Sequence, residues 1–75
     1  SVFPNPSNGV FNIRFNNAVI MPSKVRVISV IGTEVLNKTI TSSASIDLSP
    51  FQSGIYYLML ESEGATKTWR IVKQN

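Results

Sequence analysis

The sequence contains neither cysteine nor histidine among its 75 residues. Without cysteine there is no disulfide and no thiolate metal site, and without histidine the commonest general base and metal ligand is missing. Only four residues are acidic, so the paired carboxylates that glycosidases use are scarce. These absences predict no catalytic, cofactor or metal site, and we expect the chain not to be an enzyme.

Long hydrophobic runs and charge clusters are also lacking. No stretch approaches the roughly 20 apolar residues of a transmembrane helix, so we predict no membrane-spanning segment. Seven basic and four acidic residues give a net charge of +3, and they are spread along the chain, which does not favour a nucleic-acid surface. A chain this short makes one small domain held by hydrophobic burial alone.

What the sequence does contain is short apolar segments between turn residues. The clearest is IYYLML at residues 55–60, an unbroken run of β-formers that follows Gly54. Apolar residues on both faces are typical of a central strand. The acidic segment at 61–64 then predicts a hairpin turn into a last strand near 66–74.

The beginning of this run carries a second signal. The spacing of Gly54, Tyr56 and Leu58 matches the tyrosine corner of immunoglobulin-like sandwiches, in which a tyrosine two residues before a core position binds upstream backbone through its hydroxyl. We therefore predict a buried Tyr56 whose hydroxyl contacts residues 48–53, with Tyr57 on the surface of the sheet.

Alternation of apolar and polar residues marks the other strands. Segments with this pattern or with many β-formers lie between turn residues at 2–3, 11–15, 25–31, 34–40, 44–48, 55–60 and 66–74. The alternation of apolar and polar residues breaks after Ile28, which predicts a bulge with one extra residue near Ile28 and Ser29. The polar segment at 34–40 suggests an edge strand. We predict an all-β fold, a small immunoglobulin-like antiparallel β-sandwich of about seven strands.

Basic residues surround Trp69 in the last strand, an arrangement that could stack and neutralise nucleic acid. Alternation argues against this, because Lys67 and Lys73 share the Trp69 face while Arg70 lies opposite. We expect Trp69 to cover the core or an edge, and no nucleic-acid partner. An exposed, basic last strand also favours self-association, since an unpaired edge can bind a second copy.

Five segments occur in a fixed order along the chain: Val2-Phe3-Pro4-Asn5-Pro6, Val25-x-Val27-x-x-x-x-Gly32-x-x-Val35, Ile46-Asp47-Leu48-Ser49, Gly54-Ile55-Tyr56-x-Leu58 and Arg70-Ile71-Val72-Lys73. In this order and spacing they resemble the type A C-terminal sorting domain of the type IX secretion system of Gram-negative bacteria. The resemblance covers the whole chain. Two positions of the middle hairpin depart from it: Ser29, where relatives often carry an acidic or amide residue, and Thr33, where a basic residue is common.

The resemblance implies a secretion signal and not a catalyst. It implies that residues 1–75 are the single C-terminal sorting domain of a longer secreted protein, which passes through the periplasm and ends on the cell surface or outside the cell. The implied partners are an outer-membrane translocon and a sortase-like peptidase that removes the domain. By position, the implied recognition residues are Gly54, Tyr56, Leu58, Arg70, Ile71, Val72 and Lys73, with an opening motif of Pro4, Asn5 and Pro6.

Two other interpretations stay open at this point. The chain could be an accessory β-sandwich module that binds carbohydrate or protein through Tyr57 or Trp69. It could also be a structural spacer, which predicts tandem copies in the parent protein, and no internal repeat occurs within these residues.

We expect the purified chain to be folded, all-β and free of metal, because alternating strands supply a core while the side chains supply no ligand set. Far-ultraviolet circular dichroism and elemental analysis test this. A spectrum dominated by helix, or stoichiometric metal after purification without chelators, would contradict it.

Overall fold

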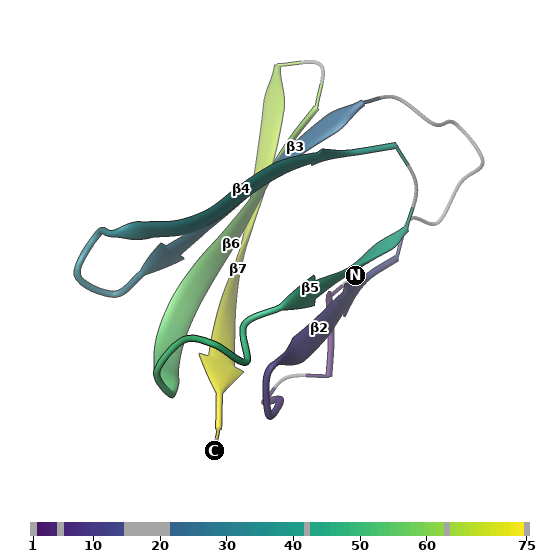
Figure 1. Cartoon of the computed structure of the whole chain (residues 1–75). Coiled ribbons are helices and arrows are strands. Elements are labelled where there is room, and N and C mark those ends of the chain that lie inside the picture. Colours follow the sequence, from purple (N-terminus) through teal and green to yellow (C-terminus); the bar gives the residue numbers. More distant parts are fainter. Residues whose placement is uncertain (1, 5, 15–21, 42, 63, 75) are drawn as a thin grey trace.

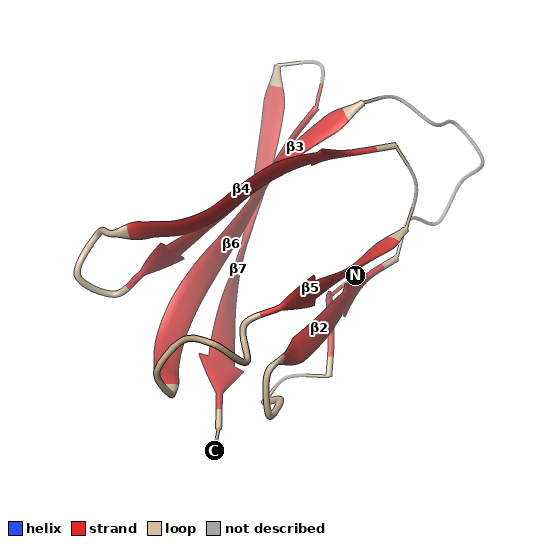
Figure 2. Cartoon of the chain, viewed as in Figure 1, coloured by secondary structure: helices blue, strands red, loops and turns tan. Residues whose placement is uncertain are grey.

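In a computed structural model, residues 2–4, 6–14, 22–41, 43–62 and 64–74 are described. Every regular element in these ranges is a strand (Figure 2), which confirms the all-β prediction. None of the described residues belongs to a helix that could cross a membrane. The strands are β1 (Val2–Phe3), β2 (Val10–Ile13), β3 (Ser23–Ser29), β4 (Glu34–Ile40), β5 (Ala44–Asp47), β6 (Gly54–Ser62) and β7 (Ala65–Lys73).

The strands form two antiparallel sheets, with the orders β1-β2-β5 and β4-β3-β6-β7 (Figure 1). These correspond to strands A, B and E facing strands C′, C, F and G of an immunoglobulin-like sandwich. The predicted sandwich is therefore confirmed. The apolar strand β6 is central and the polar strand β4 lies at an edge, as their sequences predict.

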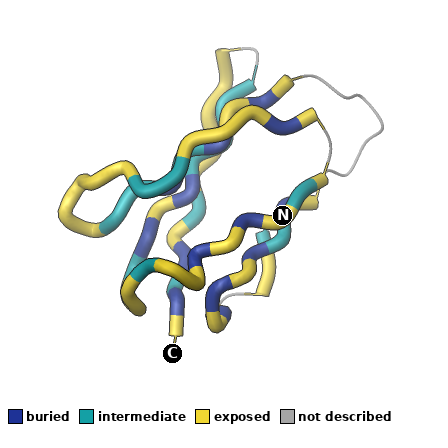
Figure 3. The backbone as a smooth tube through the Cα atoms, viewed as in Figure 1, coloured by how far each residue is buried: buried dark blue, intermediate teal, exposed yellow. Residues whose placement is uncertain are grey.

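The core consists of apolar side chains that point from both sheets into the space between them. Buried and exposed residues alternate along the strands (Figure 3), because successive side chains of a strand point to opposite faces. Leu48 closes one end of the core, with Phe51 packed beside it. The buried residues are Phe11, Ile13, Val25, Val27, Ile40, Ile46, Leu48, Tyr56, Leu58 and Ile71.

The tyrosine corner lies at the connection between β5 and β6. Tyr56 is 6% exposed, and its hydroxyl donates a 2.6 Å hydrogen bond to the Gln52 carbonyl. Leu58 is fully buried, whereas Tyr57 is 37% exposed. The prediction from the spacing of these residues is confirmed in both parts, the backbone partner of the hydroxyl and the orientation of the two tyrosines.

The predicted bulge is present, but on the partner strand. Val27 pairs with Leu36 and Ile28 pairs with Glu34, so the unmatched residue is Val35 of β4. Strand β3 itself stays in register with β6 to its last residue. The extra residue was expected in β3 because its alternation breaks there, and that assignment is wrong.

Ser29 explains why the alternation of β3 breaks without a bulge in that strand. Its side chain accepts a 3.2 Å hydrogen bond from the Thr33 N–H, and its backbone N–H donates to the Thr33 carbonyl at 2.8 Å. A polar residue at this inward position therefore closes the hairpin turn. The turn also carries Val30 and Ile31, and Ile31 is 85% exposed.

The hairpin between β6 and β7 is tighter than predicted. The acidic segment at 61–64 was expected to form the turn, but β6 extends past Glu61.

Arg26 contacts Glu34 at 2.7 Å and Glu61 at 3.4 Å, which links β4, β3 and β6 across the outer face. The Arg26 hydrogen bond lowers the pKa of the Glu34 carboxyl. Glu63 lies outside the described residues.

Truncation of the two tyrosines tests the corner. Tyr56→Ala should lower the free energy of unfolding by about 3–5 kcal/mol, because it removes a buried ring, and Tyr57→Ala should cost within about 1 kcal/mol. Tyr56→Phe isolates the hydroxyl, and its loss should cost about 1–2 kcal/mol because the Gln52 carbonyl loses its partner. Urea unfolding measures all three. Equal losses for the two alanine variants would contradict the assignment of faces.

Candidate functional site

The residues that the resemblance singles out near the C-terminus come from two neighbouring strands. The antiparallel register of β6 and β7 pairs Gly54 with Lys73 and Tyr56 with Ile71. Two motifs that are separate in the sequence therefore form one two-stranded ladder. The end of the ladder that contains the start of β6 and the end of β7 lies at the same end of the molecule as the C-terminus (Figure 1).

The opening motif leads to the same ladder. Beyond β1 the chain reaches the end of β7, where Ser7 pairs in parallel with Lys73. The Ser7 N–H donates to the Val72 carbonyl at 3.0 Å, and the Gln74 N–H donates to the Ser7 carbonyl at 2.7 Å. Residues 6–9, which we call the strap, thus close the edge of β7 at its C-terminal end. This contact was not predicted from the sequence, since no local pattern signals a pairing between distant segments.

The strap is held by its own turn and by the corner between β5 and β6. The Ser7 hydroxyl donates to the Val10 carbonyl at 2.6 Å and accepts the Gly9 N–H at 3.2 Å. The Gly9 carbonyl accepts the Leu48 N–H at 2.7 Å. Ser7 is 8% exposed, so its polar atoms are satisfied inside the fold. The strap therefore joins the last strand to the tyrosine corner.

Asp47 closes the turn at this corner. Its Oδ1 accepts the Ser49 N–H at 2.9 Å, so this carboxylate is a local hydrogen-bond acceptor. Hydrogen bonds from the Ser49 hydroxyl and backbone lower the pKa of Asp47, and the positive charge of Lys73 lowers it further. The acid therefore stabilises a turn.

Lys73 departs from expectation. The last strand was expected to present it as an exposed cation, but the residue is 6% exposed. It lies on the same face of β7 as buried Ile71, beside its pairing partner Ser7. The long aliphatic part of a lysine side chain can cover apolar surface. Lys73 therefore belongs to the folded end of the sandwich rather than to an open basic surface.

Burial divides the implied recognition residues into two groups. Tyr56, Leu58, Ile71 and Lys73 are buried, whereas Gly54 and Arg70 are exposed and Val72 is half-buried. The opening motif contributes exposed Pro4 and Pro6, and Asn5 lies outside the described residues. Successive residues of β6 and β7 point to opposite faces of the sheet. This alternation is the signal that could have separated the buried motif residues from the exposed ones in the sequence.

The outward residues of the ladder form one surface. Cross-strand pairs join Tyr57 to Arg70 and Ile55 to Val72, and we call these four residues the outer patch. Strand β3 adds Ile28, which pairs with Tyr57. A phenol ring, aliphatic side chains and a guanidinium are groups that bind protein partners. Within the described ranges no cluster of three or more acids, histidines or cysteines could hold a metal ion.

Residues 1–74 match the sequence family described as the secretion system C-terminal sorting domain. No curated protein matches the chain. The match spans the opening motif, the strap and both strands of the ladder, and it confirms the resemblance inferred from the five segments.

Two glycines with nearly the same φ angle test the contact between strap and corner. Gly9 has φ +151° and Gly54 has φ +148°, but a Cβ at Gly9 would lie 2.6 Å from the Ser49 Oγ, whereas one at Gly54 meets nothing within 4 Å. Gly9→Ala should therefore cost about 1–3 kcal/mol more than Gly54→Ala in urea unfolding. Adding Ser49→Ala to Gly9→Ala should recover part of the loss. Equal costs for the two glycines would show that the strap is not tightly packed there.

Proposed function

The chain belongs to the family of secretion system C-terminal sorting domains, and on that premise we propose that the outer-membrane translocon of the type IX system reads the folded end of this domain. The family comprises sorting signals for type IX secretion and is not a family of enzymes. Such a signal directs export across the outer membrane, to the cell surface or to the medium.

The ladder closed by the strap is the observation that carries this proposal. A signal read as an unfolded peptide needs only a continuous stretch of sequence. Here the opening segment is hydrogen-bonded to the last strand, and the last strand is paired along its length with β6. The motifs are complete as a surface only when the chain is folded, which supports recognition of the folded domain.

Burial limits which residues the translocon contacts. We assign contact to the outer patch and to the adjacent Gly54, since aromatic and arginine side chains supply much of the binding energy of protein interfaces. Tyr56, Leu58, Ile71 and Lys73 act indirectly, because they hold the ladder in place. A substitution at a buried position therefore changes recognition through folding, and one in the outer patch changes it directly.

Removal of the domain after export is the second part of the proposal. We propose, from the family resemblance, that a sortase-like peptidase cuts the exported protein before β1. A peptidase must bind its substrate in an extended form, and the backbone from β1 onward is engaged with β2, where Val2 pairs with Ile13. A cut before this pairing leaves the sandwich intact.

The alternative of an accessory binding module receives less support at the residues first considered for it. Trp69 is packed against the core, in line with the expectation that it covers the core. Tyr57 is exposed, but it lies in the outer patch that the sorting function uses.

Export of a reporter tests the sorting function. Fused to the C-terminus of a periplasmic reporter, the intact chain should carry it to the surface and medium fractions of a strain with a functional type IX system. Deleting residues 70–75 is a poor test, because it removes fully buried Ile71 and the partner of the strap. Arg70→Ala and Tyr57→Ser should instead leave the reporter in the periplasm although the domain stays folded, with a cooperative melting transition shifted by a few degrees or less.

Lys24→Ala is the matched control, since it removes an exposed cation from β3 of the same sheet. Lys24→Ala should be exported normally, and a cytoplasmic marker controls for lysis. Failure of the intact fusion to leave the periplasm would overturn the sorting function. Normal export of both outer-patch variants would overturn only the assignment of the contact surface.

A further inference from the structure

The sandwich has two open sides, each bounded by one edge strand of each sheet. Among the described strands, β1 and β5 are the edges of one sheet, and β4 and β7 are the edges of the other. An unprotected edge exposes a row of backbone N–H and C=O groups to which another chain can pair, so proteins usually protect their edges. In this chain the two open sides are protected differently.

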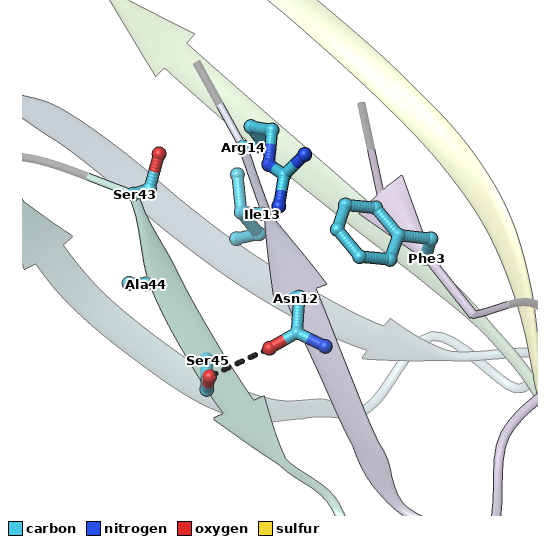
Figure 4. Close-up of a pocket in the computed structure, with 7 residues that line it drawn as sticks. All are labelled: Phe3, Asn12, Ile13, Arg14, Ser43, Ala44 and Ser45. Atoms are coloured by element: carbon cyan, nitrogen blue, oxygen red, sulfur yellow. Dashed lines mark hydrogen bonds between the residues drawn. The ribbon is translucent and has the colours of Figure 1, made fainter.

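The side formed by β4 and β5 is closed by a lysine. The Lys38 ammonium reaches from β4 to donate to the Ser45 carbonyl of β5 at 3.3 Å, so one side chain spans both edges. The Ser45 hydroxyl donates to the Asn12 Oδ1 at 2.8 Å, which ties β5 to the neighbouring β2 (Figure 4). The bulge at Val35 distorts β4 further. A strand added on this side would have to displace the lysine.

The side formed by β1 and β7 is closed only in part. Strand β1 has two residues, and the Arg14 guanidinium lies over its Phe3 ring, with Cζ 5.1 Å from the ring centre (Figure 4). The strap pairs with the end of β7 at Lys73. None of the described segments pairs with the outer edge of β7 between residues 65 and 69, and residues 65–68 are exposed. We call residues 65–69 the open edge.

The hydrogen bonds of the strap show which backbone groups face the open edge. The Val72 carbonyl and the Gln74 N–H both bond to Ser7, so the backbone groups of these two residues point away from β6. The backbone groups of successive residues in a strand point to alternate sides. Further back along β7, Thr68 and Thr66 therefore direct their N–H and C=O groups to the same outer side. The open edge thus offers donors and acceptors that a further strand can bind.

Lys67 determines which strand fits this edge. It is exposed, and it belongs to neither of the ion pairs found among the described residues. If two copies paired along their open edges about a two-fold axis, their Lys67 side chains would lie close together, and like charges across a ladder are unfavourable. A carboxylate on an added strand would instead attract Lys67. The charge therefore favours an acidic strand over a second copy.

We propose that an extended, acidic segment of a partner protein adds to the open edge as a further strand. Main-chain hydrogen bonds to Thr66 and Thr68 supply the affinity, and the attraction between Lys67 and a carboxylate supplies the preference for an acidic sequence. The inference goes beyond the sorting function, because translocon contact was assigned to the outward side chains of the outer patch and not to this edge.

Amide hydrogen exchange tests the proposal because it separates the N–H groups of alternate residues. In the free 75-residue chain, the Thr66 and Thr68 amides should exchange fast, while Lys67 and Trp69, whose N–H groups point to β6, should exchange slowly. A short synthetic peptide that alternates valine with glutamate should slow exchange at Thr66 and Thr68 at millimolar concentration or below. A matched peptide with lysine at each glutamate position should bind at least about fivefold more weakly.

Thr68→Pro and Thr68→Val are matched variants within the open edge. Proline removes an N–H that points outward and no hydrogen bond to β6, a position at which an edge strand tolerates it, whereas valine keeps the N–H. Thr68→Pro should abolish binding of the acidic peptide, and Thr68→Val should leave it unchanged. Thermal melting checks that both variants are folded. Lys67→Glu leaves the backbone intact, and it should reverse the preference between the two peptides.

Several outcomes would overturn the proposal. Among these are equal binding of the two peptides, undiminished binding by folded Thr68→Pro, an unchanged preference in Lys67→Glu, and no slowing of exchange at Thr66 and Thr68. If Thr68→Pro does not fold, the charge reversal at Lys67 decides. Slowing that grows with the concentration of the chain in the absence of peptide would overturn the proposal in favour of a second copy at the open edge.

Discussion

The fold of this domain depends on the parallel pairing of Ser7 with Lys73. Two hydrogen bonds from this pairing fix the last strand to a segment near the other end of the chain, and Gly9 joins that segment to the tyrosine corner. Three regions far apart in the sequence are thereby held at one end of the sandwich. In a small domain without disulfides, such a non-local contact fixes the strap to the end of β7, at the cost of closing a long loop.

Four of the residues that the family resemblance singles out in β6 and β7 are buried in this chain. Tyr56 and Ile71 face each other inside the ladder, while Tyr57 and Arg70 face each other outside it. The inner pair holds the two strands of the ladder in the core, and the outer pair lies on the surface to which we assign partner contact. Motif residues at alternate positions therefore have different physical roles, and a substitution experiment needs a folding measurement to separate them.

Local chemistry made part of this structure predictable. The spacing from Gly54 to Leu58 predicted both the burial of Tyr56 and its backbone bond, because a tyrosine corner is a property of a few consecutive residues. The strap was not predictable, since Ser7 finds its partners across the length of the chain. For Lys73, alternation indicated the inward face while its charge suggested exposure, and the structure follows alternation because the strap covers that end of the strand. Val35 was missed because a bulge can lie on either of two paired strands.

Val72 shows how these constraints meet in one residue. Its side chain belongs to the outer patch, and its carbonyl accepts the Ser7 N–H. Displacing the strap would free that carbonyl and the end of β7, and a paired strand end is more ordered than a free one. A partner that contacts Val72 and Arg70 therefore binds a surface whose shape depends on the strap. The shape of the outer patch at the end of β7 is in this way conditional on the strap being in place.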